Sequence, residues 1–502
     1  MRFWEVVVLV VNFGFLYWAL ISGRKTLEDW RMIWPAAVAW LLVIIQVAVE
    51  GARWQMLPAY LTPLILTLYY FIGGTRKKTR KKIVVAGQIV LLTVYVVISV
   101  LPVYYFPVFS LKKPTGPFAV GTTTYHWVDE QRGEPNTEDP NDHRELMVQI
   151  WYPAADVQGV KPASYIPGNS PEVRASIAKW LGLPAISISH LGQIRTHSYV
   201  DVALSDAEKE YPVLIFSHGM GGFRTQNMFQ VEELASHGYI VVGIDHPYDA
   251  AITVFPDGRI IQQNPTPVFS NAENDQHIML WADDASFVLD KVAELESNDP
   301  QGRLTGRVDL GRIGMFGHSY GGALAYQMLM QDSRIKAAMD MDGALFGEYA
   351  SEQAEAKAKT KVMDNRPVEA KPFFLMIAKE TLDMDKFKEG LDEVPPEQVK
   401  EMTGLTPGEL ERDFDGILQR FRDSMKGGGL SLSIPQASHI SFSDLTLYSP
   451  LLRARGEDAA VNHRMVNAFS LAFFNQHLRG MDEQALTRLS EQYKDVTFTI
   501  NK

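Results

Sequence analysis

Four long apolar runs fill most of the first 105 residues, and they restrict the fold of this part of the chain more than any other feature. They extend from Phe3 to Ser22, Met32 to Val49, Met56 to Ile72 and Ile83 to Tyr105. Each has close to the roughly 20 residues that an α-helix needs to cross the hydrocarbon core of a bilayer. A soluble helical bundle would need polar faces, which these runs lack. The sequence therefore predicts an all-α, four-helix transmembrane region over residues 1–108.

The basic side chains between these runs predict an orientation in the membrane. The segment TRKKTRKK between the third and fourth runs has six positive charges, and three more lie between the first and second runs. Between the second and third runs, Arg53 is the one basic residue. Connections rich in lysine and arginine stay on the cytoplasmic side. We therefore expect a multi-pass protein of the cell membrane, with everything after Tyr105 on the external side.

Charge and cysteine content exclude several classes of function. Residues 1–108 have 11 basic and 4 acidic side chains, whereas the whole chain has a net charge of −11, so the remaining residues hold a net charge of −18. Such an acidic domain is a poor partner for nucleic acid. The absence of cysteine excludes a cysteine nucleophile and a cysteine-ligated metal. No histidine and carboxylate cluster has metal-ligand spacing, so we expect no metal and no cofactor.

After the linker SLKKPTGPF, short apolar segments alternate with helical patterns. Seven segments are strand candidates: MVQIWYP, YPVLIFSHG, YIVVGIDHP, RIGMFGHS, IKAAMDMDG, FFLMIAK and LSLSIPQ. Most are continuously apolar, which is typical of parallel strands that are covered by helices on both faces. The alternation indicates an α/β domain with a mostly parallel sheet. We expect it to occupy residues 109–502, with a helical insertion at about 383–429.

One helix of this insertion has a clear start signal. In TPGELERDFDGILQRFRDSM, Thr406 and Glu409 form a capping box, and Pro407 occupies the first helical position. One face of this helix is apolar, with Leu410, Phe414, Ile417, Leu418, Phe421 and Met425. We expect this face to pack on the domain. The alternatives are a lid and a surface that rests against the bilayer.

The segment RIGMFGHSYGG provides the candidate nucleophile. Ser319 stands between Gly317 and Gly321, after a strand candidate and before the helical pattern GGALAYQMLM. A nucleophile on a sharp strand-to-helix turn needs small residues two positions before and after it, because strand and helix approach each other closely there. The context therefore favours the serine elbow of an α/β-hydrolase over a chance G-x-S-x-G match.

The order of a hydrolase triad along the chain is serine, acid, histidine. Of the histidines far enough beyond the serine, His463 and His477 lie in a helical pattern, whereas His439 follows the last strand candidate in the loop PQASHISFSD. We predict that His439 takes the proton of Ser319 and then returns a proton to the leaving alcohol.

Two places in the sequence can supply the acid. Asp340 and Asp342 end the strand candidate IKAAMDMDG, and Glu380 and Asp383 follow the next strand. An aspartate beside a histidine holds the ring and stabilises its cation, which either place allows if the loop reaches. Asp342 is preferred because it lies at the strand exit and a glycine follows it.

The oxyanion hole requires backbone N–H groups that point at the developing negative charge. We predict the N–H of Tyr320, directly after the nucleophile, and that of Met220 in the glycine-rich turn SHGMGGFR. His218 in the same turn is expected to brace the loop rather than to act chemically.

Several of these segments together resemble the platelet-activating factor acetylhydrolase family, the plasma and type II lipases of the α/β-hydrolase fold. They are FSHGMGGFRTQNMFQVEELASHGYIVVGIDH, GHSYGGALAYQ followed by DMDG, and QASHISFSD. The likeness extends from about Phe118 to the C-terminus. The chain departs from the family in its four apolar runs, in IDHPYD and in the inserted helices.

This resemblance implies a calcium-independent serine esterase of the 1-alkyl-2-acetylglycerophosphocholine esterase type, which removes short or oxidised acyl chains from phospholipids. It places the acid after the strand that follows the nucleophile helix, which is Asp342, with Ser319 and His439 as its partners. It also implies Met220 and Tyr320 for the oxyanion hole.

The sequence thus predicts a membrane-anchored ester hydrolase that acts on lipid-like or other short-acyl esters. Two alternatives remain open. One is an acyltransferase, in which an alcohol of the cell envelope replaces water as the acyl acceptor. The other is a non-enzymatic ligand sensor on a membrane stem, against which the complete serine, acid and histidine set argues.

Overall fold

The computed structural model describes residues 1–22, 33–72, 82–166, 168–264, 270–350, 371–426 and 428–501. The chain forms two compact units. The first contains Met1–Ser110, Ser170–Ile194 and Leu447–Leu451, and the second contains Leu111–Asn169, Arg195–Thr446 and Leu452–Lys502.

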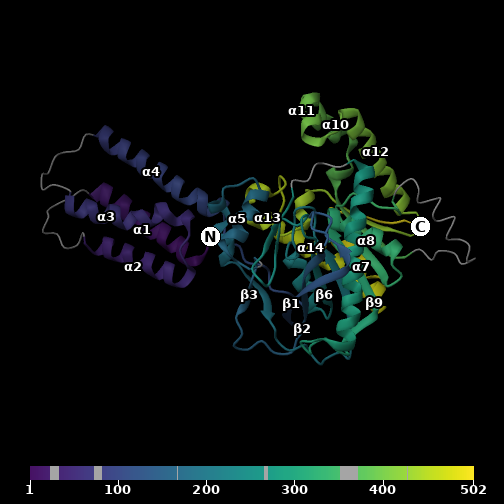
Figure 1. The fold of residues 1–502 in the computed structure, drawn as a ribbon. Helices are drawn as coiled ribbons and strands as arrows, with labels where there is room; N and C mark the ends of the chain where they lie inside the picture. The colour runs from purple at the N-terminus through teal and green to yellow at the C-terminus, as the bar shows by residue number, and fades with distance from the viewer. Residues whose placement is uncertain are drawn as a thin grey trace, which may run out of the picture. The chain divides into compact units, whose positions relative to one another are not determined.

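The first unit is helical (Figure 1). Its long helices are α1 (Phe3–Ser22), α2 (Ile33–Glu50), α3 (Leu57–Ile72) and α4 (Lys82–Tyr105), with the 3₁₀ turn η2 (Trp54–Met56) before α3. Helix α1 packs against the other three long helices. Within the described residues, α1, α2 and α4 are long and apolar enough to cross a membrane, whereas α3 has 16 residues and contains Pro63. Length and composition therefore support three of the four predicted spans.

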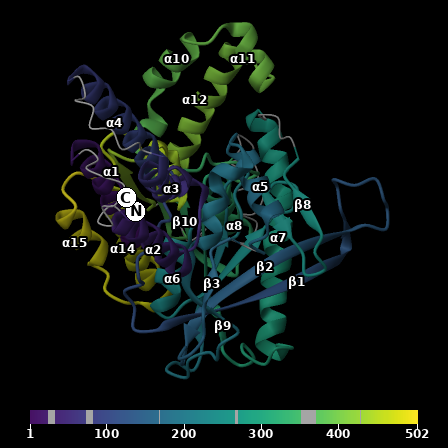
Figure 2. The same ribbon diagram turned by 90° about the vertical axis from the view of Figure 1, so that its left-hand side faces the viewer.

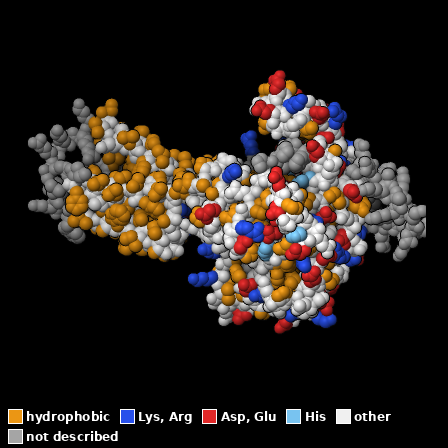
Figure 3. All heavy atoms as spheres, viewed as in Figure 1, with side chains coloured by type: hydrophobic (Ala, Val, Ile, Leu, Met, Phe, Trp, Pro, Cys, Tyr) orange, Lys and Arg blue, Asp and Glu red, His pale blue; other side chains and the backbone are white. Residues whose placement is uncertain are grey.

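The outer surface of this helical unit is apolar. Figure 3 shows hydrophobic side chains over most of it. Only 6% of the most apolar 18-residue stretch of α4 is buried, and such an exposed apolar helix is typical of one that faces lipid. These helices suggest association with a membrane. The basic connections on which the orientation prediction depends, residues 23–32 and most of TRKKTRKK, lie outside the described residues.

A later stretch of the chain also belongs to the first unit. It contains α5 (Pro171–Trp180) and η3 (Ala185–Gln193). Gln193 accepts a hydrogen bond from Arg2 at 2.8 Å and donates one to the carbonyl oxygen of Ala52 at 2.8 Å, and Gln55 contacts His190 at 2.9 Å. Polar contacts thus join this stretch to the start of α1 and to the segment that follows α2.

The second unit is built on one sheet of eleven strands. Its spatial order is β13 (Thr497–Ile500), β12 (Leu430–Ile434), β11 (Phe373–Ala378), β10 (Ile335–Met341), β9 (Val308–His318), β5 (Tyr211–Ser217), β6 (Ile240–Asp245), β2 (His143–Ala154), β1 (Ala119–Gly133), β4 (Arg195–Val200) and β3 (Pro162–Ser164). The strands from β6 to β12 in this order are parallel, and β2 runs antiparallel to β6 and to β1. A separate small hairpin pairs β7 (Ile252–Val254) with β8 (Ile260–Gln262).

Helices cover both faces of this sheet (Figure 2). On one face, α7 (Asn271–Asn298) and α8 (Tyr320–Gln331) bury a continuous apolar core against the central strands. On the other face lie α6 (Met228–Ser236) and α14 (Ala459–Arg479), with α15 (Ala485–Gln492) packed on α14. Strands β5, β6 and β11 are buried along their whole length, because both of their faces are covered. The predicted α/β-hydrolase architecture is confirmed.

The segment at about 383–429, which is predicted to be a helical insertion, contains α10 (Met384–Asp392), α11 (Pro396–Thr403) and α12 (Pro407–Ser424), and η4 (Lys379–Leu382) precedes it. Helix α12 starts with the capping box of Thr406 and Glu409. Its apolar face is half-buried: the ring of Phe414 stacks on that of Phe387 at 4.3 Å, and Phe421 joins the core. This helix therefore packs on its neighbours. The C-terminal part of the domain also contains η5 (His439–Phe442), α13 (Leu445–Tyr448) and η6 (Pro450–Leu452).

Candidate active site

Ser319 is the single residue between β9 and α8, and its backbone is strained. Its φ and ψ are 56° and −122°, a conformation that L-residues rarely adopt, and its N–H donates to the carbonyl oxygen of Met341 at 2.9 Å. A Cβ atom on Gly317 would lie 2.1 Å from the carbonyl oxygen of Gly321, and one on Gly321 would lie 2.1 Å from that of Ser217. Both glycines are therefore required by close backbone packing at the elbow.

A continuous chain of hydrogen bonds joins serine, histidine and acid. The Oγ atom of Ser319 lies 2.9 Å from Nε2 of His439, and Nδ1 of this ring lies 2.8 Å from Oδ2 of Asp342. Because a carboxylate only accepts hydrogen bonds, Nδ1–H donates to Asp342, which leaves Nε2 free to accept the serine O–H. The buried acid thus holds the ring in the tautomer that a general base needs.

Asp342 is itself held in place by three donors. It follows β10 with a φ of 58°, and its Oδ1 accepts a hydrogen bond from the N–H of Ala378 at 2.8 Å. Its Oδ2 accepts from the hydroxyl of Thr381 at 3.0 Å, in addition to the histidine. Donors from the end of β11 and from η4 therefore fix the carboxylate that faces His439.

The other three candidate acids have different environments. Asp340 is fully buried, and burial raises the pKa of its carboxyl group well above the ordinary value. Glu380 forms an ion pair with Lys386, and Asp383 accepts the N–H of Lys386 at 3.1 Å as the N-cap of α10. Among the four candidate acids, Asp342 alone contacts the histidine.

The two predicted oxyanion donors belong to two segments that lie next to Ser319. Tyr320 is the first residue of α8, and Met220 lies in the turn after β5. This turn approaches the serine closely, since a Cβ atom on Gly219 would lie 3.0 Å from Cβ of Ser319. Within the described part of the chain, the backbone N–H groups of Met220 and Tyr320 have no assigned acceptor. Both groups are therefore available to a ligand oxygen.

His218 has the bracing contacts that its sequence position suggests. Its ring is completely buried, Nδ1–H donates to the carbonyl oxygen of Gly219 at 2.7 Å, and Nε2 accepts the N–H of His246 at 3.3 Å. Burial lowers the pKa of His218 to about 3, so the ring is neutral at physiological pH. Its two ring hydrogen bonds stabilise the turn after β5.

Comparison with known proteins shows which proteins the chain is similar to. Residues 105–282 match the family model described as platelet-activating factor acetylhydrolase, isoform II. A probable 1-alkyl-2-acetylglycerophosphocholine esterase from Arthroderma benhamiae is 25% identical over 406 residues, which are 78% of this chain and 94% of that protein. Platelet-activating factor acetylhydrolase from Cavia porcellus is 25% identical over 260 residues, which are 47% of this chain and 56% of that protein.

The solved structure of a ferulic acid esterase from Streptomyces cinnamoneus matches the fold. Its TM-score is 0.56 at 25% sequence identity, and the match covers 78% of this chain and all of that chain. The chain is an α/β-hydrolase esterase related to platelet-activating factor acetylhydrolase, isoform II. The resemblance predicted from the sequence is confirmed.

Two residues of this acetylhydrolase-like site were missed by the sequence analysis. His318, directly before the nucleophile, donates through Nε2–H to the carbonyl oxygen of His439 at 2.7 Å, and its Nδ1 accepts a hydrogen bond from Gln226 at 2.7 Å. The side-chain oxygen of Gln226 in turn accepts the N–H of Gly219 at 3.1 Å. The pair thus connects the turn that contains Met220 to the loop that contains His439. The one sequence signal for His318 was its place directly before the serine of the G-x-S-x-G motif.

Among the residues that the structure describes, no group of three or more histidine, aspartate or glutamate side chains is arranged to hold a metal ion.

Proposed function

We propose that the chain is a membrane-anchored serine esterase that cleaves short or oxidised acyl chains from phospholipids. The observation that carries the proposal is the unbroken set of hydrogen bonds from Ser319 through His439 to Asp342. The elbow strain, the two available backbone donors and the relationship to acetylhydrolases support it further.

The geometry supports a two-step acyl transfer to water. His439 takes the proton of Ser319 as Oγ attacks the ester carbonyl carbon, and the N–H groups of Met220 and Tyr320 stabilise the resulting oxyanion. The intermediate collapses with release of the alcohol, which receives its proton from the imidazolium, and leaves an acyl-serine. Water then attacks this ester with His439 as base, and the acid product leaves as the serine regains its proton.

Covalent labelling provides the primary test. A fluorophosphonate probe is expected to label the full-length chain in detergent and to fail on Ser319→Ala, and His439→Ala is expected to lose several orders of magnitude in turnover, because triad members act as a unit. If the wild-type chain were not labelled, the esterase proposal would be abandoned in favour of a ligand-sensing role.

A matched pair of variants tests the acid. Asp342→Asn is expected to lower kcat by on the order of 10⁴-fold, because the ring then loses its orienting acceptor. Asp383→Asn removes an equivalent charge from a helix cap and is expected to leave kcat nearly unchanged. The opposite ranking would assign the acid to the segment after β11.

The preference for short chains follows from the cost of extraction from a bilayer. Transfer out of the apolar phase costs about 0.8 kcal/mol for each CH₂, so a palmitoyl ester with roughly 14 more methylenes than an acetyl ester is disfavoured by about 11 kcal/mol. We expect kcat/KM for acetyl and butyryl esters, and for short sn-2 phospholipids, to exceed that for palmitoyl analogues in mixed micelles. Faster cleavage of palmitoyl substrates would make the insertion a lipase lid instead.

The membrane part of the proposal rests on the apolar helices and on the sequence of their connections. Three helices have the length and composition of membrane spans. The basic charges of TRKKTRKK favour a cytoplasmic location for that connection, which puts the esterase domain on the external side.

A further inference from the structure

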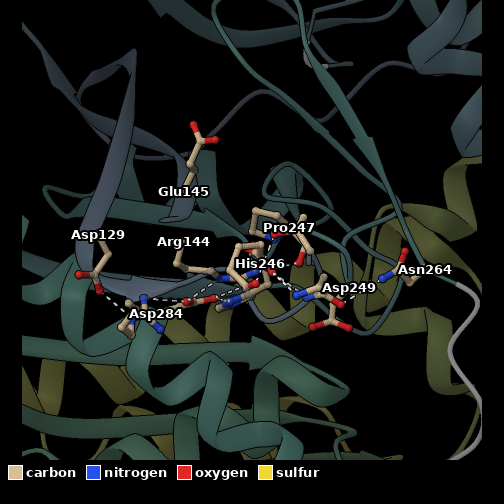
Figure 4. A network of polar contacts seen from close by, with 12 residues as sticks. Asp129, Arg144, Glu145, His246, Pro247, Asp249, Asn264 and Asp284 are labelled. Atoms are coloured by element: carbon tan, nitrogen blue, oxygen red, sulfur yellow. Dashed lines mark hydrogen bonds and ion pairs between the residues drawn. The ribbon is translucent and has the colours of Figure 1, made fainter. Parts of the chain in front are cut away.

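A second serine, histidine and aspartate arrangement lies inside the hydrolase domain. The hydroxyl of Ser217, the last residue of β5, lies 3.0 Å from Nε2 of His246, and Nδ1 of this histidine lies 2.9 Å from Oδ2 of Asp284 on α7. Figure 4 shows His246 beside Asp284, with the guanidinium of Arg144 on the same carboxylate. All four residues are 0% exposed. Ser217 therefore cannot meet a substrate, which leaves a structural role for the arrangement.

The protonation states of this cluster follow from its contacts. Burial is the largest influence on Asp284 and opposes its ionisation. The charge of Arg144, which donates to the carboxylate at 2.7 and 3.1 Å, and the hydrogen bonds from Arg144 and His246 together outweigh burial and lower the pKa of the carboxyl group. Burial also lowers the pKa of His246, which keeps the ring neutral. Nδ1–H therefore donates to Asp284, and Nε2 accepts the hydroxyl of Ser217. Each hydrogen bond in the cluster has one defined direction.

The cluster is attached to the turn that bears the oxyanion donor Met220. Besides its ring contact with Ser217, His246 donates its backbone N–H to the ring of His218 at 3.3 Å. Three residues later, the carbonyl oxygen of Asp249 accepts the N–H of Gly221 at 2.9 Å. The residues on both sides of Met220 are thus bonded to the segment that begins at His246.

Helix α7 holds the same segment from the other side. The ring of Trp281 stacks on that of His246 at 3.9 Å and 9°, and its Nε1–H donates to the carboxylate of Asp249 at 2.7 Å. The edge of Trp281 also meets the ring of Tyr320, the second oxyanion residue, at 4.9 Å and 73°. One helix therefore supports the segments of both donors.

We infer that His246, oriented by Asp284 and bonded to Ser217, is a positioning residue that holds the oxyanion turn in its reactive geometry. The inference rests on the proposed esterase function. Because the oxyanion forms only after attack, a displaced donor weakens binding of the transition state more than binding of the substrate. Disruption of the cluster is therefore expected to lower kcat and to leave KM nearly unchanged.

Two variants test this role in the full-length chain. Ser217→Ala removes one hydroxyl from a fully buried position, and we expect kcat for p-nitrophenyl butyrate to fall by about tenfold. His246→Gln removes the ring and is expected to lower kcat by about 100-fold, since a misplacement of about 1 Å can have this effect. Affinity for a trifluoromethyl ketone, whose adduct is an oxyanion, should fall in parallel, whereas affinity for an unreactive ether analogue should not.

Matched controls separate positioning from general stability. Ser470→Ala removes a buried hydroxyl from α14, on the opposite face of the sheet, and His463→Gln removes a buried histidine that stacks on Phe229 at 3.9 Å. We expect both controls to keep kcat and the affinity for the ketone within about twofold of the wild-type values, even where they lower Tm as much as Ser217→Ala and His246→Gln do.

The outcomes distinguish this inference from the proposed function. If wild type is active and Ser217→Ala and His246→Gln change kcat no more than their controls do, or if they raise KM alone, the positioning role is wrong. If His246→Gln does not fold, Ser217→Ala decides the question. A wild-type chain without esterase activity or probe labelling would refute the proposed function itself.

Discussion

Glu232 on α6 is a buried carboxyl group that should make the stability of the hydrolase domain depend on pH. Its side chain is 1% exposed. Its Oε1 accepts the N–H of His197 at 2.7 Å and the hydroxyl of Ser198 at 2.5 Å, whereas Oε2 has no hydrogen-bond partner within the described residues. Burial outweighs these two hydrogen bonds and raises the pKa of Glu232 to about 8.

The sign and size of the effect follow from this pKa. Between the ordinary value of 4.5 and the folded-state value of about 8, the folded protein binds the proton more tightly than the unfolded protein does. The free energy of unfolding therefore decreases as the pH rises through this window. At about 1.4 kcal/mol per pH unit, the full loss is about 5 kcal/mol, which is an upper limit for one buried group.

Glu232→Gln removes this ionisation and keeps the shape of the side chain. The variant and the wild type should have similar Tm values at pH 5, and the variant should be more stable by several degrees at pH 9. Thermal unfolding of the full-length chain in detergent, followed by circular dichroism, measures the difference at each pH. Glu491→Gln, at an exposed position, is the control and should keep the wild-type profile. Parallel profiles for wild type and Glu232→Gln would refute the argument.

Three further predictions concern the elbow, the membrane topology and metals. Gly321→Ala should abolish esterase activity, because the added Cβ atom would lie 2.1 Å from a backbone oxygen. The control Gly390→Ala should be active, because its Cβ atom would meet nothing within 4 Å, and equal rates for the two variants would contradict the elbow packing. The chain has no cysteine, so Lys494→Cys should react with an impermeant maleimide on intact cells and Thr79→Cys should not; the reverse pattern would invert the topology. EDTA should leave ester hydrolysis unchanged, and restoration of a lost rate by added zinc or calcium would contradict the proposed mechanism.

Local sequence patterns predicted those parts of the site that short-range sterics determine. Gly317 and Gly321 lie two residues before and after Ser319, and neither has room for a side chain. The turn after β5 is rich in glycine because its backbone approaches Ser319 closely. The alternation of apolar segments predicted a doubly covered sheet for the same reason, because each segment has to bury its own side chains. Such requirements can be recognised without knowledge of the partners.

The acid could not be assigned from local pattern alone. Asp340 and Asp342 lie two residues apart at one strand exit, and Glu380 and Asp383 follow the next strand. Which carboxylate meets His439 depends on how β10, β11 and the loop after β12 end relative to one another, and only the assembled sheet determines this. The preference for Asp342 came from its place at the strand exit and from the glycine that follows it, and the family resemblance implied the same residue.

By itself, then, the sequence determined where the long apolar helices, the seven central strands of the sheet and the serine elbow occur, because periodicity, glycine placement and apolar length are properties of short segments. Only the tertiary structure decided which distant polar groups meet. His246 and Asp284 are 38 residues apart, and the segment around η3 joins the N-terminal helices rather than the sheet. A buried polar group needs a hydrogen-bond partner, but a long chain contains many side chains that could provide the same hydrogen bond. Packing of the sheet and its helices selects one of them by bringing it within hydrogen-bond distance.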